Sequence, residues 1–111
     1  MYDHPIHQFI RRPCVLNHQD ADPADVYGDP PLAVITSTDE RCYVTQSRRA
    51  EEDAVEVERW QVYFLPSTTV DANDTVDVDG MTLHLYGNPW TVYDPVTGWA
   101  THIEASAVRR R

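Results

Sequence analysis

The stretch TVDVDGMTLHL, residues 75–85, decides the fold, because it contains two alternating runs joined by Asp79-Gly80. An Asp-Gly pair supplies the positive φ angles of a two-residue type I′ turn, which connects antiparallel strands. With this turn the apolar side chains of both runs fall on one side of the hairpin. That side carries Val76, Val78, Met81, Leu83 and Leu85. We therefore predict a β-hairpin with one face in a hydrophobic core and the other in water.

Residues 58–65 give the second β signal, since apolar side chains alternate up to Pro66, which cannot donate to a strand ladder. The face that we expect in the core carries Trp60, Val62 and Phe64. The valines at 55 and 57 have the opposite parity, which predicts a bulge or a separate short strand near residues 58–59.

A third hairpin is predicted from residues 90–93 and 99–105, joined by the turn sequence DPVTG at 94–98. Residues 87–89 (Gly-Asn-Pro) are expected to separate it from the hairpin before. Parity puts Trp60 in the core. The other aromatic residues of this half are typical of both small β cores and interfaces, and for these we expect the core. They are Tyr63, Tyr86, Trp90, Tyr93 and Trp99.

The first half is less regular, with short β-like runs at residues 8–16, 32–36 and 42–46. Residues 17–31 contain three prolines, four aspartates and no period, so we expect a loop or extended arm there. The charged residues 48–54 indicate a solvated loop or a short helical turn.

The fold class is therefore all-β, as a small antiparallel β-barrel or sandwich of about six or seven short strands with long loops and an extended N-terminal arm. We favour the barrel. By size, residues 1–111 are a single domain. Within it we expect a less regular segment at 1–40, the barrel core at 42–105 and a basic tail at 106–111.

The charge balance is acidic, with 18 Asp and Glu against nine arginines and a net charge of −9. This argues against duplex binding, because phosphate contacts need a surplus of cations. Arg109, Arg110 and Arg111 end the chain and form either a partner contact, to an acidic surface or DNA, or a solubilising end. There is no signal-peptide pattern and no apolar stretch approaching about 20 residues, so we expect a chain made in the cytoplasm with no membrane contact.

Motifs for chemistry are missing from the sequence. Cys14 and Cys42 lack CxxC spacing and are expected to be reduced core residues. The histidines at 4, 7 and 18 do not form the close pairs of a structural zinc site with them. The aspartates at 71, 74, 77 and 79 lack the order of an EF-hand. No nucleophile elbow or phosphate loop is found, so we expect no enzyme, no cofactor and no metal.

The second half resembles the head-to-tail stopper proteins, also called head closure or head completion proteins, of long-tailed phages that infect actinobacteria. The match covers about residues 42–105, with VTQSRRAE at 44–51 resembling the strand-to-loop segment of that family. The ordered parts that carry it are RWQVYFLP at 59–66, DTVDVDG at 74–80, YGNPW at 86–90, DPVTG at 94–98 and HIE at 102–104.

The resemblance implies a non-enzymatic β-barrel in the virion neck. Such a protein forms a homo-oligomeric ring below the portal and adaptor, closes the DNA exit channel after packaging and offers a platform to the tail terminator. DNA would pass through the channel without sequence-specific binding.

For subunit or channel contacts we single out the charged segment, which carries both signs and is either an interface or a solvated loop. It consists of Arg48, Arg49, Glu51, Glu52 and Asp53. The alternatives are another neck component, a tail terminator or adaptor, and a small β-module that binds a peptide or glycan through exposed aromatic residues.

Overall fold

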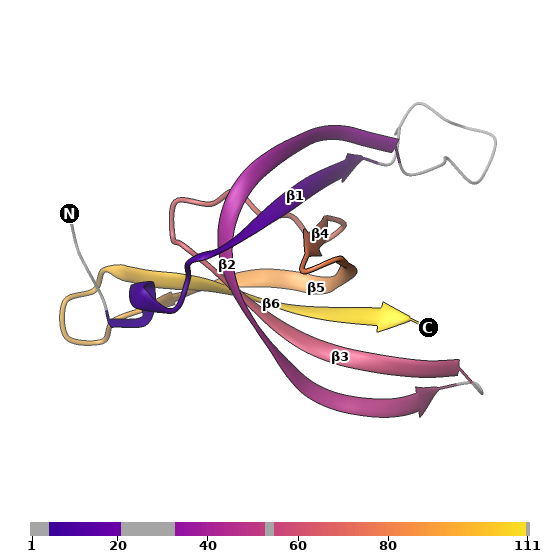
Figure 1. Ribbon diagram of the computed structural model, residues 1–111. Coiled ribbons are helices and arrows are strands. Elements are labelled where there is room, and N and C mark those ends of the chain that lie inside the picture. Colours follow the sequence, from indigo (N-terminus) through magenta and orange to yellow (C-terminus); the bar gives the residue numbers. More distant parts are fainter. Residues whose placement is uncertain (1–4, 21–32, 53–54, 111) are drawn as a thin grey trace.

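The computed structural model describes residues 5–20, 33–52 and 55–110. These residues form an all-β fold, a closed barrel in which every neighbouring strand pair is antiparallel and the strand order is β1-β2-β3-β6-β5-β4 (Figure 1). The predicted barrel is thereby confirmed. In chain order its elements are the 3₁₀ helix η1 (Pro5–Gln8) and the strands β1 (Arg12–Asp20), β2 (Ala33–Glu52), β3 (Val55–Phe64), β4 (Thr75–Val78), β5 (Met81–Tyr93) and β6 (Ala100–Arg110).

The predicted hairpin of β4 and β5 is confirmed in its register. Val78 faces Met81 and Val76 faces Leu83. Asp79 has a φ of 53° and Gly80 a φ of 76°, the two positive values that a type I′ turn requires. The apolar side of this hairpin lies in the core and the polar side in solvent, as the alternation predicts.

The core fills the inside of the barrel with side chains from all six strands. Trp60 packs against it, as predicted, together with the partly buried Val44, Val70 and Met81. Its buried members are Cys14, Leu16, Cys42, Val62, Phe64, Val76, Val78, Leu83, Leu85, Ile103, Ala105 and Ala107. Cys14 and Cys42 are both buried and free, which confirms the expectation for the two thiols.

Strand β2 corrects the prediction for the first half. It is one continuous strand of 20 residues, whereas the sequence predicted separate short runs with a loop or helical turn at residues 48–54. Its first part pairs with β1, and its second part pairs with β3. Residues 17–20, which we expected to begin a loop or arm, belong to β1 instead. Residues 21–32 and 53–54 lie outside the described parts of the chain.

Two hairpin arms extend past the closed barrel. Beyond the position where Asn17 faces Thr75, β1 and β2 are paired only with each other among the described residues. Residues 55–56 of β3 likewise face only β2 in the described ladders, because pairing with β6 starts at Val57. We call these the β1–β2 arm and the β2–β3 arm, and we count with the second arm its base, residues 48–50 of β2 and 57–59 of β3, where β3 still pairs with β6. Both arms lie on one side of the molecule and diverge there (Figure 1).

Bulges account for two irregularities in the sequence pattern. The break predicted near residues 58–59 lies opposite a register shift, but the extra residue is Ser47 on β2, between the pairs Gln46–Trp60 and Arg48–Arg59. Residues 87–89 do not separate two hairpins as predicted. They lie within β5, at a register shift between Tyr86 and Trp90.

Candidate assembly surface

Aromatic side chains form a row across the outside of four strands. In the strand registers Tyr43 faces Tyr63, Tyr63 faces Glu104, and Glu104 faces Trp90. Residues that face each other across antiparallel strands share a face of the sheet. Their neighbours along the strands, such as Cys42, are in the core, so this row lies on the outer face.

Ring contacts hold most of this row together. The ring centroids are 6.0 Å apart between Phe9 and Tyr43, 5.6 Å between Tyr43 and Tyr63, and 5.7 Å between Tyr63 and His102. These separations are typical of favourable tilted aromatic pairs. We define the aromatic row as Phe9, Tyr43, Tyr63, His102 and Trp90. Three of its members remain well exposed, Phe9 at 59%, Tyr43 at 38% and Trp90 at 45%.

Polar contacts hold His102, a member of the row, in place on β6 and link β6 to β5 and η1. His102 Nε2 lies 2.9 Å from Glu104 Oε1, and His102 Nδ1 lies 2.8 Å from Thr101 Oγ1. The Thr101 hydroxyl donates to the Val92 carbonyl at 3.1 Å, which joins β6 to β5. His7 Nε2 is 2.7 Å from the Thr101 carbonyl, and this contact ties η1 to the same strand. The row is therefore a pre-formed surface, because its side chains are positioned without a partner.

Burial raises the pKa of the Tyr63 phenol, and the negative charge of Glu104 adds to this effect. Both causes favour the neutral phenol, which can donate a hydrogen bond.

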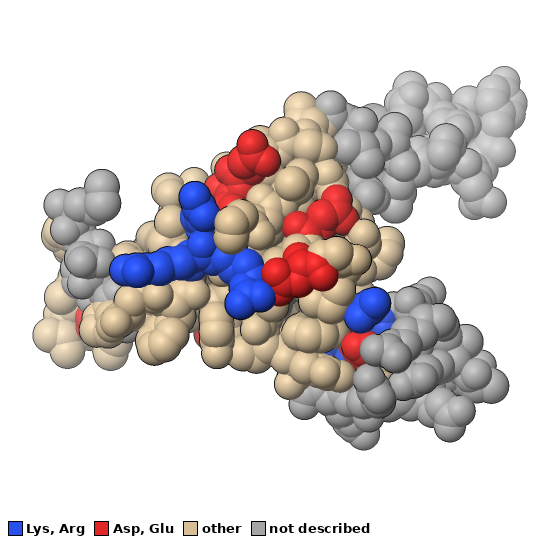
Figure 2. Space-filling view, in the orientation of Figure 1, with Lys and Arg blue, Asp and Glu red and all other residues tan. Residues whose placement is uncertain are grey.

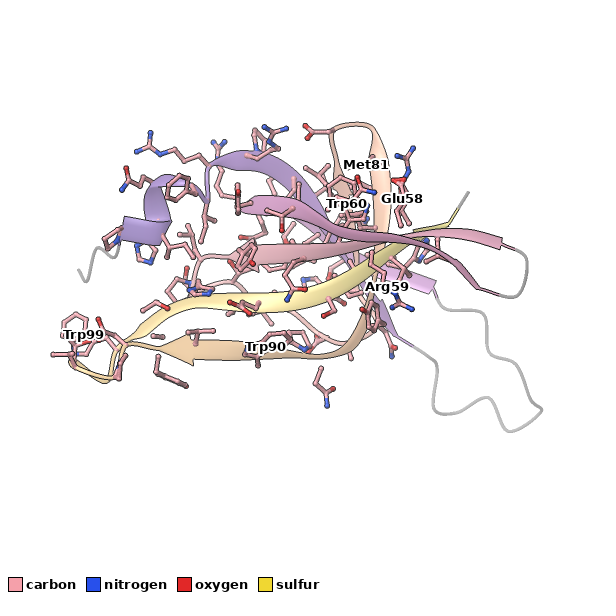
Figure 3. The ribbon with its side chains drawn as sticks, turned by 90° about the horizontal axis from the view of Figure 1, so that it is seen from below. Glu58, Arg59, Trp60, Met81, Trp90 and Trp99 are labelled. Atoms are coloured by element: carbon pink, nitrogen blue, oxygen red, sulfur yellow. The ribbon has the colours of Figure 1, made fainter. Side chains whose placement is uncertain are left out.

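The prediction that the other aromatic residues lie in the core is wrong for all five, since Tyr63 is half-buried on the outer face. Tyr86, Trp90, Tyr93 and Trp99 are all exposed. Trp90 lies on the outer face because it is opposite Glu104. Trp99 has the parity of the inner face, but it precedes β6, in the turn that lies at the end of the barrel away from the arms (Figures 1 and 3).

The β5–β6 turn itself is well ordered by hydrogen bonds. Asp94 Oδ1 accepts from the amide of Val96 at 2.8 Å, and the Asp94 carbonyl accepts from the amide of Gly98 at 2.7 Å. The turn presents Val96, which is almost fully exposed, and it also contains the exposed Trp99. An exposed apolar tip on a rigid turn is a second surface suited to protein contact.

The charged segment lies on the β2–β3 arm. Arg48, Arg49, Glu51 and Glu52 all belong to β2, and they face Arg59, Glu58, Glu56 and Val55, respectively. Asp53 lies outside the described residues.

The C-terminal arginines approach the same arm. Arg109 and Arg110 continue β6, where they face Glu58 and Val57. Arg109 Nη1 lies 3.9 Å from Glu58 Oε1, whose side chain is buried. Arg49 and Arg109 therefore occupy register positions on either side of Glu58. The structure thus brings together two groups that are far apart in the sequence, although Arg111 lies outside the described residues.

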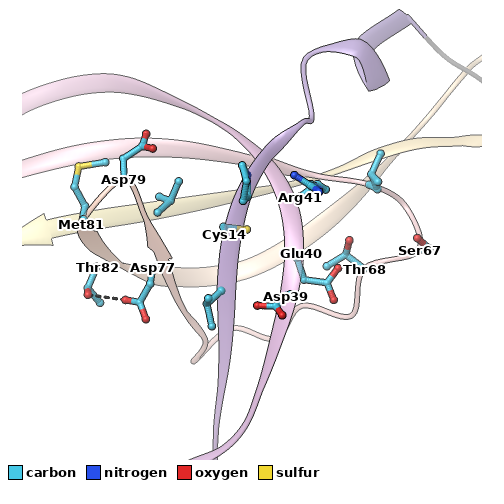
Figure 4. Close-up of a pocket in the computed structure, with 15 residues that line it drawn as sticks. Cys14, Asp39, Glu40, Arg41, Ser67, Thr68, Asp77, Asp79, Met81 and Thr82 are labelled. Carbon is cyan, nitrogen blue, oxygen red and sulfur yellow. Dashed lines mark hydrogen bonds between the residues drawn. The ribbon is translucent and has the colours of Figure 1, made fainter.

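An acidic hollow of about 780 Å³ lies between β1, β2 and the β4–β5 hairpin (Figure 4). Its lining includes Asp39, Glu40, Arg41, Asp77 and Asp79, and Asp77 accepts a hydrogen bond from Thr82 at 2.7 Å. Four carboxylates and one guanidinium favour a cationic group of a partner. Sequence reasoning placed the aspartates at 77 and 79 on the solvent face correctly, but it did not anticipate the two acidic residues of β2 beside them.

The surface around this hollow carries charges of both signs. Arg12 forms an ion pair with Asp79, and Arg41 donates to the carbonyl of Arg11 at 3.2 Å. Arginine side chains gather in the middle of the face shown in Figure 2, with carboxylates beside them. Among the described residues, no helix has the length and apolar content needed to span a membrane.

Comparison with known proteins shows which solved structure has a similar fold. No protein-family model matches the chain, and no curated protein sequence does so. Among solved structures, the chain is similar to the phage-like element PBSX protein xkdH from Bacillus subtilis, with a TM-score of 0.53 and 19% sequence identity. The similarity covers 88% of this chain and 92% of that chain. At this identity it shows a common fold, a small closed β-barrel.

Proposed function

We propose that this protein is a structural component of a phage neck, and more specifically a head-to-tail stopper. The observation that carries the proposal is the fold shared over 88% of the chain with a protein from a phage-like element. The ordered turn motifs of residues 59–104, which resemble those of stopper proteins, support the same role. In this role the chain forms a ring below the portal and adaptor, closes the DNA channel and docks the tail.

The arms suit contacts between copies in a ring. A cyclic ring needs two different surfaces on each subunit, one for each neighbour. The β2–β3 arm extends past the barrel and brings together positions of both charges, Arg49 and Glu58, with Arg109 beside them. We assign this arm, including Arg48, Glu51 and Glu52, to the contact with a neighbouring copy or with the channel.

The aromatic row suits contact with a different neck protein. Interfaces are enriched in tyrosine, tryptophan and phenylalanine, and ordered aromatic side chains lose little entropy when a partner covers them. Phe9, Tyr43 and Trp90 are exposed while ring contacts or strand pairing hold them in place. We assign the row to the adaptor or the tail terminator.

The net charge of −9 suits a protein that surrounds DNA without gripping it. Acidic surfaces repel phosphates, and a conduit has to let DNA pass. The proposal therefore involves no catalytic step, no cofactor and no reading of DNA sequence.

The decisive experiment is electron cryomicroscopy of the virion whose genome encodes this chain, at a resolution at which individual β-strands can be traced. We expect a ring of barrels between the adaptor and the tail. A position elsewhere in the particle would overturn the stopper assignment, and absence from the particle would overturn the virion assignment as a whole.

The role of the β2–β3 arm has a separate test, in which Arg48, Arg49, Glu51 and Glu52 are all changed to Ser. We expect folded protein and a reduced yield of infectious particles. The matched control changes His84 to Ser, since His84 is exposed on β5 and belongs to none of the candidate surfaces. Normal yield with the arm variant would show that the arm is not an interface.

A small β-module that binds a peptide or glycan is the second candidate, and the exposed aromatic row favours it. Peptide and glycan arrays combined with sedimentation velocity separate the two functions. A strong array signal from a chain that stays monomeric and is missing from virions would select the binding module.

A further inference from the structure

Three potential metal ligands from two distant segments meet at one end of the β1–β4 ladder, the seam that closes the barrel. His18 lies on β1, next to a register shift, and Asp71 and Asp74 lie in the connection between β3 and β4. His18 Nδ1 is 2.9 Å from Asp74 Oδ2 and 4.0 Å from Asp71 Oδ2. One ligand atom from each residue lies within 4.8 Å of the others.

Asp74 provides an independent sign that a ligand belongs here. Its side chain is 0% exposed, and its Oδ1 is buried without a hydrogen-bond partner. Its Oδ2 accepts from the backbone amide of Asp71 at 2.9 Å and lies next to His18. Both oxygens are bonded to the same carbon, so an ion bound by both of them would also give the unpaired Oδ1 a partner. Buried carboxylate oxygens normally have a partner, and a cation would supply one.

We propose that His18, Asp71 and Asp74 bind a divalent transition metal ion of the zinc type. Zinc bond lengths and tetrahedral angles put ligand atoms about 3.4 Å apart, and the distances of 2.9 and 4.0 Å lie on either side of this value. The side chain of Asp71 is 72% exposed, so it can close on the ion and leave a path for entry. One imidazole and two carboxylates leave the fourth position to water.

The metal would fasten the seam that closes the barrel. Strands β1 and β4 pair over a short ladder that ends where Asn17 faces Thr75, one residue from both His18 and Asp74. The amide of Leu85 donates to the Asp74 carbonyl at 3.1 Å, so β5 is connected to the same point. An ion held by His18 and the two aspartates would therefore join β1 to the β3–β4 connection. The seam is also the base of the β1–β2 arm.

The test is zinc binding to the full chain, measured by isothermal titration calorimetry and by thermal unfolding. We expect one ion per chain. At free zinc 100-fold above the Kd, we expect a melting temperature raised by about 10 °C. Cobalt substitution should give visible absorption without a thiolate charge-transfer band. No binding heat and no melting shift would overturn the proposal, and a thiolate band would instead assign the metal to the cysteines.

Variants locate the ion without relying on the buried aspartate. His18→Gln and Asp71→Asn should each weaken zinc binding at least tenfold and remove most of the melting shift. The matched control is His84→Gln, on the polar face of β5, which should bind like the unaltered chain. If His18→Gln keeps the full affinity, the site is elsewhere. None of these outcomes depends on a role in a phage neck, so the proposed function can fail while the metal site stands.

Discussion

Trp90 offers a quantitative test of the aromatic row. A tryptophan presents about 250 Å², and the 45% of Trp90 that is exposed amounts to about 110 Å². If a partner covers all of it, the burial contributes about 2.8 kcal/mol at about 25 cal/mol per Å². Such a loss weakens association by about 100-fold. We therefore expect Trp90→Ser to need up to about 100-fold more protein for the same degree of assembly.

The assay is head-to-tail joining in vitro. DNA-filled heads that lack this protein are mixed with tails and increasing amounts of the purified chain, and infectious particles are counted. His84→Ser is the control, because His84 is also exposed on β5 and is polar. Trp90→Tyr should recover most of the activity, since it keeps an aromatic ring.

Each variant first has to show a cooperative thermal transition by circular dichroism, so that misfolding is not read as weak assembly. If Trp90→Ser and the unaltered protein give the same number of infectious particles at each protein concentration, Trp90 is not covered by a partner. The assignment of the row is then wrong.

Three further predictions concern the fold. The added Cβ of Gly80→Ala would meet no atom within 4 Å, so only the φ of 76° opposes the substitution. The positive φ should cost about 1–2 kcal/mol and lower the melting temperature by about 4–8 °C. An unchanged melting temperature would contradict the type I′ turn. Leu16→Ala should cost about 2–5 kcal/mol in urea unfolding, since Leu16 is fully buried, and a loss below about 1 kcal/mol would contradict its core position. The raised pKa of Tyr63 contributes stability below the unfolded pKa of about 10 and loses it as the pH rises through the folded value. The melting temperature of Tyr63→Phe should therefore fall less steeply above about pH 10 than that of the unaltered chain. An equally steep fall would refute the raised pKa.

The sequence predicted the fold best where a strand has one face in the core. The β4–β5 hairpin and the inner face of β3 show period-two alternation because their side chains alternate between core and solvent. Residues 18–20 and 33–36 of the β1–β2 arm and residues 48–52 of the β2–β3 arm show no such period, since the arms extend past the barrel, where no core selects one face. For this reason the sequence pattern indicates a loop or helical turn at residues 48–54, although residues 48–52 belong to β2.

The candidate surfaces were harder to predict than the strands. Parity alone puts Trp90 with Tyr86 and His84 on the outer face, but the frequency of tryptophan and tyrosine in small β cores suggested the core. The contact between Arg109 and Glu58 depends on the register of β6 against β3, which no local pattern specifies. The grouping of His18 with Asp71 and Asp74 likewise needs the closed barrel, because β1 meets β4 only at the seam.

Strand β2 has a mechanical consequence beyond its place in the sheet. Twenty residues of extended strand have a contour length of about 66 Å. Strand β2 curves around the barrel and takes part in both arms (Figure 1). A force on the β2–β3 arm therefore acts on the same strand whose other end belongs to the β1–β2 arm. Two register shifts interrupt the ladders of β2, one at Ile35 opposite β1 and one at Ser47 opposite β3, so bending should concentrate at these positions. How much of this force reaches the β1–β2 arm thus depends on the stiffness of both bulges.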